Sequence, residues 1–141
     1  GLIAFSSDVS DQVPLTPLAT GRDRLNQAID GLEATGGTAL LDGVDLAVTK
    51  LQDLNDAERI NAIVVMTDGQ ENRSRTRLGE LTERLRRSQG TGVPVAVFCI
   101  AFGRDADMAT LDAISSAAGG FTRRGDLETI RELYRTLSTY F

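Results

Sequence analysis

The most informative part of the sequence is the stretch Ile63–Asn72 (IVVMTDGQEN), in which an apolar run ends abruptly in a carboxylate, a glycine and a polar loop. An apolar segment rich in β-branched residues and closed by a turn dipeptide is typical of a strand buried on both faces of a parallel sheet. Asp68 then lies at the carboxyl end of that strand, where open α/β sheets bind ligands. A carboxylate there suits a hard cation such as Mg²⁺.

Length and composition predict a single domain over residues 1–141. The chain has 141 residues, of which 41% are hydrophobic and 25% charged, and these are ordinary values for a globular domain. The net charge of −5 argues against nucleic acid as a partner, since phosphate binding requires a basic face. The sequence shows neither a transmembrane segment nor a signal peptide, and it leaves the compartment open.

Several classes of catalytic site are excluded by residues that the sequence lacks. Histidine is absent, which excludes a Ser-His-Asp triad and a Cys/His zinc site within this chain. The only cysteine, Cys99, lies in the apolar run 95–100, and we expect it to be a small core residue. Neither G-x-G-x-x-G nor G-x-x-x-x-G-K-[ST] occurs, so no phosphate-binding loop is predicted.

Apolar runs alternate with helical periodicity along the chain. The runs predict strands over 2–5, 60–67, 93–102 and 119–122, and an edge strand or extended loop over 13–17, where two prolines exclude a central strand. The periodicity predicts helices over 22–34, 40–54, around 78–85 and 108–114, and a last helix carrying apolar residues 127–137. The order implies an α/β fold with a doubly wound, mostly parallel sheet and helices on both faces.

Five short motifs follow one another in a characteristic order: GLIAFSS at 1–7, TGGTAL at 35–40, VVMTDG at 64–69, IAFG at 100–103 and AGGF at 118–121. With the predicted elements between them, the whole chain resembles a von Willebrand factor type A (vWA) domain, which has a Rossmann-like fold. The resemblance implies a metal-ion-dependent adhesion site (MIDAS), which holds Mg²⁺ or Mn²⁺ through an Asp-x-Ser-x-Ser loop, a threonine and an aspartate. By resemblance the last two are Thr38 and Asp68.

The Asp-x-Ser-x-Ser loop has no match in this sequence. The nearest string, DVSDQ at 8–12, lacks the final serine, and Pro14 and Pro17 follow where the family has a long helix. The resemblance therefore implies that the family's first, central strand and its metal loop lie upstream of this numbering. We expect strands 1–5 and 60–67 to run parallel without pairing directly, with an upstream segment or a neighbouring chain between them.

Each candidate residue also has a purely structural interpretation. Thr38 could be the N-cap of the helix that follows it, and Asp68-Gly69 could be only a turn. The glycines at 36 and 37 could simply stop the preceding helix. The remaining polar residues are predicted as solvated or capping: Glu71 and Asn72 as loop residues, Asp105 or Asp107 as a helix cap, and Arg84, Arg86 and Arg87 as a solvated helix face.

Two classes of function are consistent with these residues. The first is a non-enzymatic protein-binding module in which an acidic side chain of the partner completes the coordination of the cation. The second is a Mg²⁺-dependent hydrolase or phosphotransfer enzyme, with Asp68 as metal ligand and Glu71 or Asp105 as base. The absence of histidine and of a phosphate loop, together with the family resemblance, favours the binding module.

Overall fold

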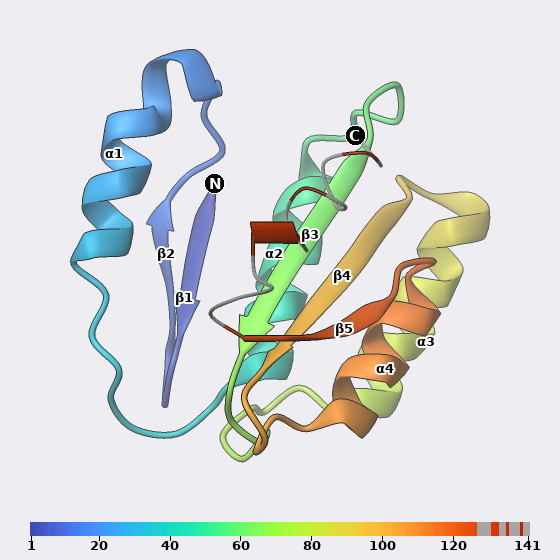
Figure 1. Cartoon of the computed structure of the whole chain (residues 1–141). Helices are drawn as coiled ribbons and strands as arrows, with labels where there is room; N and C mark the ends of the chain where they lie inside the picture. The colour runs from blue at the N-terminus through green and yellow to red at the C-terminus, as the bar shows by residue number, and fades with distance from the viewer. Residues whose placement is uncertain (127–130, 133–134, 136–138, 140–141) are drawn as a thin grey trace.

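The fold is built on two sheets in the residues that the computed structural model describes, which are 1–126, 131–132, 135 and 139. Strand β1 (Leu2–Phe5) pairs with β2 (Val9–Val13) in an antiparallel hairpin. Strands β3 (Asn61–Thr67), β4 (Val95–Phe102) and β5 (Thr122–Gly125) form a parallel sheet in the order β3-β4-β5 (Figure 1). The predicted α/β fold with a parallel sheet is confirmed.

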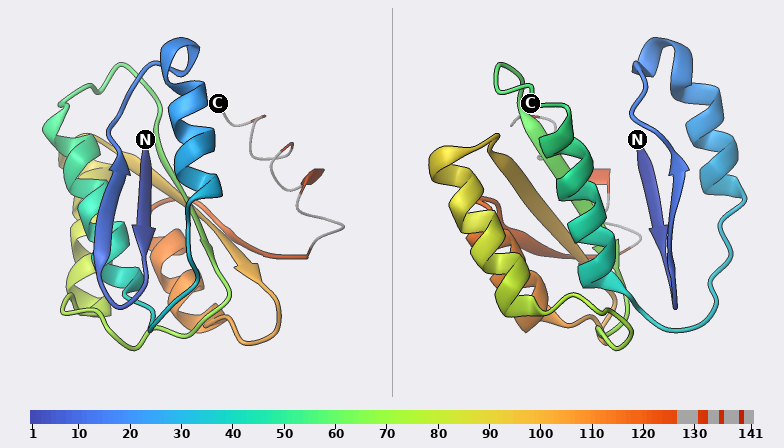
Figure 2. Two further views of the ribbon diagram at one scale, coloured as in Figure 1. Left: turned by 90° about the vertical axis from the view of Figure 1, so that its left-hand side faces the viewer. Right: turned by 180° about the vertical axis from the view of Figure 1, so that it is seen from behind.

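Four helices lie within the described residues: α1 (Leu18–Asp30), α2 (Leu40–Asp53), α3 (Leu78–Thr91) and α4 (Met108–Ala117). Figure 2 shows α1 and α2 on opposite sides of the β1–β2 hairpin, with α2 continuing beside α3 against the parallel sheet. The apolar faces of α2, α3 and α4 meet the sheet around β4 and form the main core. Its fully buried side chains include Leu40, Val48, Leu85, Val97 and Leu111.

Helix α2 is the element that joins the hairpin to the parallel sheet. Gly43 on α2 faces Phe5 of β1, and a Cβ atom at Gly43 would lie 3.1 Å from the Phe5 ring. Lys50 on the same helix forms a 2.6 Å ion pair with Asp11 of β2. The hairpin is therefore held against α2 by the close approach of Phe5 to Gly43 and by the ion pair between Lys50 and Asp11.

The hairpin and the parallel sheet are not joined by strand pairing. In the described residues β1 pairs only with β2, and β3 pairs only with β4, so each has one edge without a backbone partner. β1 and β3 point in the same direction in Figure 1. These two strands run in the same direction without pairing directly, as expected, but within the described residues they belong to two separate sheets rather than to one.

The N-terminal third differs in its boundaries from the sequence prediction. The strand predicted over 13–17 lies earlier, at Val9–Val13, and the helix predicted over 22–34 begins at Leu18 and ends at Asp30. Pro17 is the N-cap residue of α1, with φ of −53°, and Gly31 is its C-cap. A proline lacks the N–H that a helix start leaves unpaired, so Pro17 begins the helix that we had predicted to start four residues later.

The string DVSDQ at 8–12 forms the start of β2, where Asp11 carries the ion pair to Lys50. It does not open a helix, as the family's metal loop does. This placement agrees with the exclusion of that string as a metal loop.

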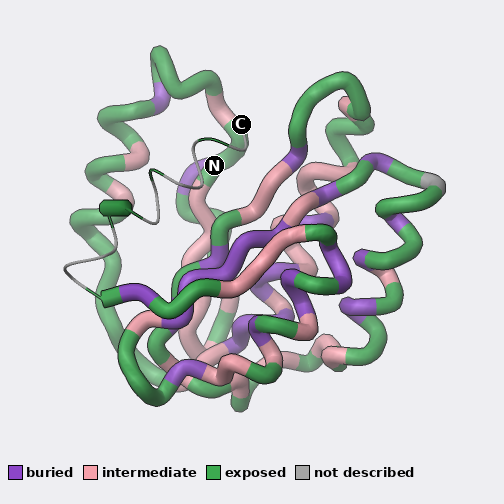
Figure 3. The backbone as a smooth tube through the Cα atoms, turned by 45° about the vertical axis from the view of Figure 1, so that its right-hand side comes forward, coloured by how far each residue is buried: buried purple, intermediate pink, exposed green. Residues whose placement is uncertain are grey.

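One face of β3 is more exposed than we predicted. Val65 is 5% exposed and faces the main core, whereas Val64 is 39% and Met66 40% exposed. α2, α3 and α4 all pack on the face of β3 that carries Val65. The prediction that this strand is buried on both faces is therefore wrong. Figure 3 shows the buried residues gathered where the strands meet these helices, while α1 is largely exposed. Most of the last predicted helix, 127–137, lies outside the described residues.

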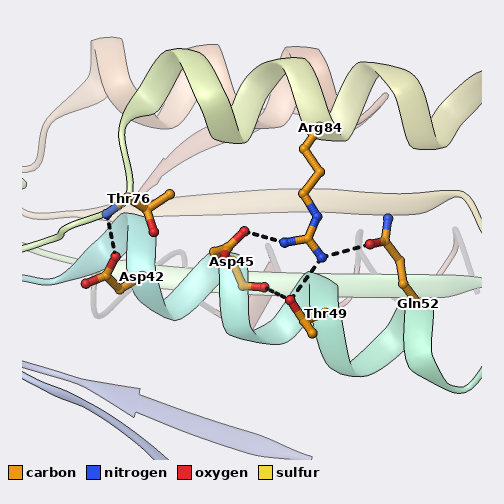
Figure 4. Close-up of polar contacts among 6 residues, drawn as sticks. All are labelled: Asp42, Asp45, Thr49, Gln52, Thr76 and Arg84. Carbon is orange, nitrogen blue, oxygen red and sulfur yellow. Dashed lines mark hydrogen bonds and ion pairs between the residues drawn. The ribbon is translucent and has the colours of Figure 1, made fainter.

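Arg84 has a structural role that the sequence did not indicate. Its guanidinium crosses from α3 to α2, where it pairs with Asp45 and donates hydrogen bonds to Thr49 (2.9 Å) and Gln52 (2.8 Å) (Figure 4). The prediction of a solvated arginine face is therefore wrong for Arg84, although Arg86 and Arg87 are exposed. Among the described helices none is both long and apolar enough to span a bilayer.

Candidate functional site

The site is built at the carboxyl end of β3, where the chain leaves the sheet at Thr67. Asp68 follows directly and is exposed, and its carboxylate makes no hydrogen bond or ion pair with the described residues. The Gly69 N–H donates to the Thr67 hydroxyl (3.3 Å), which closes the turn. Asp68-Gly69 is thus a turn, as the structural interpretation required, and it also presents a free carboxylate.

Thr38 lies beside this turn, in the loop that connects α1 and α2. Its carbonyl accepts hydrogen bonds from the N–H groups of Asn72 (3.1 Å) and Arg73 (3.2 Å), and its own N–H donates to the Asn72 side chain (3.0 Å). A Cβ atom built on Gly69 would lie 2.7 Å from the Thr38 hydroxyl oxygen. The hydroxyl therefore points at the turn that follows Asp68, and within the described part of the chain it forms no hydrogen bond.

The two glycines before Thr38 permit close packing rather than ending a helix. α1 already ends at Asp30, so the interpretation of Gly36 and Gly37 as a helix stop is wrong. Gly36 has φ of +79°, a conformation that favours glycine, and a Cβ atom there would lie 2.4 Å from the Ser7 hydroxyl. That hydroxyl accepts the Gly37 N–H (2.9 Å), which ties the loop to the end of β1.

Glu71 anchors the other side of the site. Its carboxylate accepts hydrogen bonds from the N–H groups of Leu41 (3.0 Å), Arg73 (2.9 Å) and Ser74 (2.8 Å), and from the Ser74 hydroxyl (2.7 Å). Burial raises the pKa of Glu71, but these hydrogen bonds outweigh it and the pKa is lowered. The prediction of a solvated loop residue is wrong for Glu71, which satisfies an N–H in the first turn of α2.

The interpretation of Thr38 as the helix N-cap is also wrong. Ala39 is the N-cap residue of α2, and it makes no side-chain capping bond. Glu71, from a loop 30 residues away, accepts the Leu41 N–H instead. This leaves the Thr38 hydroxyl available. At α4, by contrast, Asp107 caps as predicted, accepting the Thr110 N–H at 3.0 Å.

Asp42 fastens the segment that leads into α3. Its carboxylate accepts the N–H groups of Arg75 (3.0 Å) and Thr76 (2.8 Å), and Figure 4 shows the contact with Thr76. Burial raises the pKa of Asp42. The hydrogen bonds from Thr76 and Arg75 and the charge of Arg75 lower the pKa by more than burial raises it, so the net shift is downward. Sequence reasoning missed the contacts of Asp42 and the contact of Glu71 with Leu41, because these partners lie 30 or more positions away.

The arrangement offers a divalent cation two oxygen groups, the Thr38 hydroxyl and the Asp68 carboxylate. These are the hard ligands that Mg²⁺ and Mn²⁺ prefer. Glu71 and Asn72 are engaged with the backbone around them. No group of three or more His, Cys, Asp or Glu residues that could hold a metal is found in the described part of the chain. The chemistry of the pair fits a hard cation, but two oxygens fill only part of its coordination.

Comparison with known proteins agrees with this arrangement. The family model described as "von Willebrand factor type A domain" matches residues 1–136. The chain belongs to this family. The vWA domain is 30% identical over 132 residues to inter-alpha-trypsin inhibitor heavy chain H4 of Bos taurus and 29% identical over 132 residues to that of Homo sapiens. Each alignment covers 87% of this chain and 14% of the relative, so the chain spans a small part of these proteins.

Solved structures share the vWA fold. The von Willebrand factor type A structure from Catenulispora acidiphila has a TM-score of 0.75 and 21% identity, covering 96% of this chain and 32% of that one. Proximal thread matrix protein 1 from the mussel byssus, with a zinc-occupied MIDAS motif, has a TM-score of 0.70 and 22% identity, covering 95% and 32%. At these identities the likeness establishes the fold.

Proposed function

We propose that this vWA domain is a non-enzymatic protein-binding module whose cation is held in part by Thr38 and Asp68. One observation carries the proposal. The Thr38 hydroxyl faces the turn after Asp68, and within the described residues neither side chain has a partner, whereas their polar neighbours are fastened to the backbone. Members of this family are protein-interaction modules.

The cation would serve as the contact point for the partner. Thr38 is neutral and Asp68 carries a single charge, so a Mg²⁺ or Mn²⁺ ion held here would keep a net positive charge and attract a carboxylate from an acidic side chain of the partner. Zinc is a third candidate, because it occupies the MIDAS motif of the mussel protein.

The remaining ligands would come from water and from a further segment of protein. We propose that a strand pairs with the free edges of β1 and β3, which run in the same direction, and that its following loop contributes to the metal site. An upstream segment or a neighbouring chain could supply that strand.

The enzymatic alternative is less well supported by the geometry. Glu71, a candidate base, has a lowered pKa and already accepts four hydrogen bonds. A general base works best with a pKa near the operating pH, and Glu71 is shifted in the opposite direction. We expect no turnover of nucleotides, phosphomonoesters or esters with Mg²⁺ or Mn²⁺, and turnover that disappears in Asp68→Ala would contradict the proposal.

Calorimetric titration with Mg²⁺, Mn²⁺ and Zn²⁺ tests the proposal. Because cation affinity rises with the number and charge of ligands, we expect this chain to bind weakly, with Kd on the order of 1 mM or above. Asp68→Ala and Thr38→Ala should weaken binding further, while Asp105→Ala, an exposed carboxylate at the end of β4, serves as the matched control. Equal loss in all three variants would show nonspecific binding and contradict the proposal.

A further inference from the structure

A polar pocket of about 510 Å³ lies next to the candidate metal site. Its walls come from the turn between β1 and β2, from the start of α2 and from the segment before α3; they are formed by Ser7, Asp8, Val9, Asp42, Arg73 and Arg75. The Arg73 side chain packs over the Thr38 loop, since a Cβ atom on Gly37 would lie 2.5 Å from Arg73 Cγ. The pocket and the candidate metal site therefore share one loop.

The backbone beneath both arginines is fixed. The Arg73 N–H donates to Glu71 (2.9 Å) and to the Thr38 carbonyl (3.2 Å). The Arg75 N–H donates to both carboxylate oxygens of Asp42, at 3.2 and 3.0 Å. A side chain carried on a fixed backbone loses less freedom when it binds a ligand, so these two arginines are well placed for recognition.

The acidic residues nearby accept backbone N–H groups, and the Arg75 charge acts on Asp42 without forming an ion pair. Glu71 and Asp42 accept backbone N–H groups. Among the residues that the structure describes, neither Arg73 nor Arg75 has a side-chain ion pair, in contrast to Arg84, which pairs with Asp45. Both arginines are exposed and line the pocket.

We propose that this pocket is a second anchoring point for the protein partner, at which Arg73 and Arg75 bind a carboxylate of an acidic segment. This inference rests on the proposed function, because another carboxylate of the same segment would coordinate the cation at Thr38 and Asp68. A guanidinium binds a carboxylate through two parallel N–H···O bonds, which supplies orientation as well as attraction. The occupant is therefore a peptide segment with at least two acidic residues.

The charge of the site limits the kind of anion that fits. Asp8 and Asp42 share the pocket with the arginines, and the chain as a whole carries −5. A dense polyanion such as nucleic acid or polyphosphate would be repelled by this field, whereas separate carboxylates can each approach an arginine. Removing the exposed charge of Asp8 should strengthen binding for the same reason.

The test uses ¹⁵N-labelled full chain, a blocked peptide in which two glutamates are separated by glycines, and NMR titration in low salt with EDTA, so that no cation contributes. The peptide should shift the Arg73 and Arg75 signals, including their side-chain Nε–H groups. The double variant Arg73→Gln/Arg75→Gln should bind about 5- to 25-fold more weakly, since each exposed charge pair contributes a factor of about two to five. Arg86→Gln, an exposed arginine on α3, is the matched control and should bind like the wild type.

A gain of affinity in Asp8→Asn would support the proposal independently of any folding defect in the arginine variants. Equal affinities of the double variant and Arg86→Gln, or stronger shifts by tripolyphosphate than by the peptide, would overturn it. Repeating the titration in Mg²⁺ separates the two proposals. If peptide binding in Mg²⁺ is unchanged in Asp68→Ala, the proposed metal site is contradicted. The proposed arginine site is tested only by the titration in EDTA.

Discussion

Glu71 is the residue that holds the candidate site together. It fastens the start of α2, through Leu41, to the segment that carries Arg73 and Ser74. Thr38 lies between these two elements, and its carbonyl and N–H are bound to the same loop. The position of the Thr38 hydroxyl therefore depends on a carboxylate that is not itself a proposed ligand.

We predict that Glu71→Gln destabilises the domain by about 1–3 kcal/mol. Both carboxylate oxygens accept hydrogen bonds, one from Arg73 and Ser74 N–H and the other from Leu41 N–H and the Ser74 hydroxyl. An amide replaces one acceptor by a donor and leaves an N–H without a partner. Urea unfolding measures the change, and Glu58→Gln, an exposed glutamate, should be neutral. A neutral Glu71→Gln would contradict the anchoring role.

The lowered pKa values of Glu71 and Asp42 predict acid sensitivity. A carboxyl whose pKa is lower in the folded state stabilises the fold above its unfolded pKa, here near the ordinary values of 4.5 and 3.8. That stabilisation is lost as the pH falls through the folded pKa. The free energy of unfolding should therefore fall below about pH 4.5, and less steeply in Glu71→Gln than in Glu58→Gln. If the free energy of unfolding fell equally steeply with pH in Glu71→Gln and Glu58→Gln, the predicted contribution of Glu71 to acid sensitivity would be contradicted.

A Cβ atom at position 69 should disturb the candidate metal site directly. In Gly69→Ala the new methyl group would lie 2.7 Å from the Thr38 hydroxyl oxygen, so that hydroxyl must move. We expect weaker Mn²⁺ binding in calorimetry. Gly79→Ala is the matched control: nothing lies within 4 Å of a Cβ there, and α3 should gain up to about 1 kcal/mol. Unchanged Mn²⁺ affinity in Gly69→Ala would place the cation elsewhere.

At the scale of elements, the interface between α2 and α3 depends on one polar bridge. Arg84 is about one-third exposed, and so is its partner Asp45. A planar guanidinium reaches Asp45, Thr49 and Gln52 together, whereas a lysine ammonium cannot reproduce this geometry.

We predict that Arg84→Lys lowers the free energy of unfolding by about 1 kcal/mol, although the charge is preserved. Arg86→Lys, on the exposed side of α3, should change it by less than about 0.5 kcal/mol. A double-mutant cycle between Arg84→Lys and Asp45→Asn in urea isolates the coupling. Additive effects would show that the bridge contributes nothing.

Elements with clear periodicity were predicted well, and the misses have local causes. The apolar run of β4 and the face of α2 that carries Val44 and Val48 were found because burial imposes those patterns on the sequence. The start of α1 was placed too late because its first turn contains Thr20 and Gly21, which have low helix propensity. Asp68 was predicted from the carboxylate that ends the apolar run and from the family resemblance, whereas Thr38 came from the resemblance alone. Asp42, Arg84 and the contact of Glu71 with Leu41 were missed because the partners lie 30 or more residues away.

At the scale of the whole molecule, the free edges of β1 and β3 are the main unsatisfied feature of the described residues. Unpaired strand edges favour association with another strand. We predict that a version extended at its N-terminus by a further strand and its metal loop has a Tm higher by several degrees, on the order of 5 °C, and binds Mg²⁺ more tightly. Thermal scans of both versions test this, and equal Tm values and affinities would contradict the proposed strand.

The most direct test of the proposed metal site is paramagnetic broadening by Mn²⁺ in ¹⁵N NMR spectra of this chain, because it detects weak binding and locates it. The signals of Thr38, Asp68 and Gly69 should broaden first, and the broadening should disappear in Asp68→Ala but persist in Asp105→Ala. Broadening centred on Asp105 and Asp107, or broadening at Thr38 that survives in Asp68→Ala, would contradict the account.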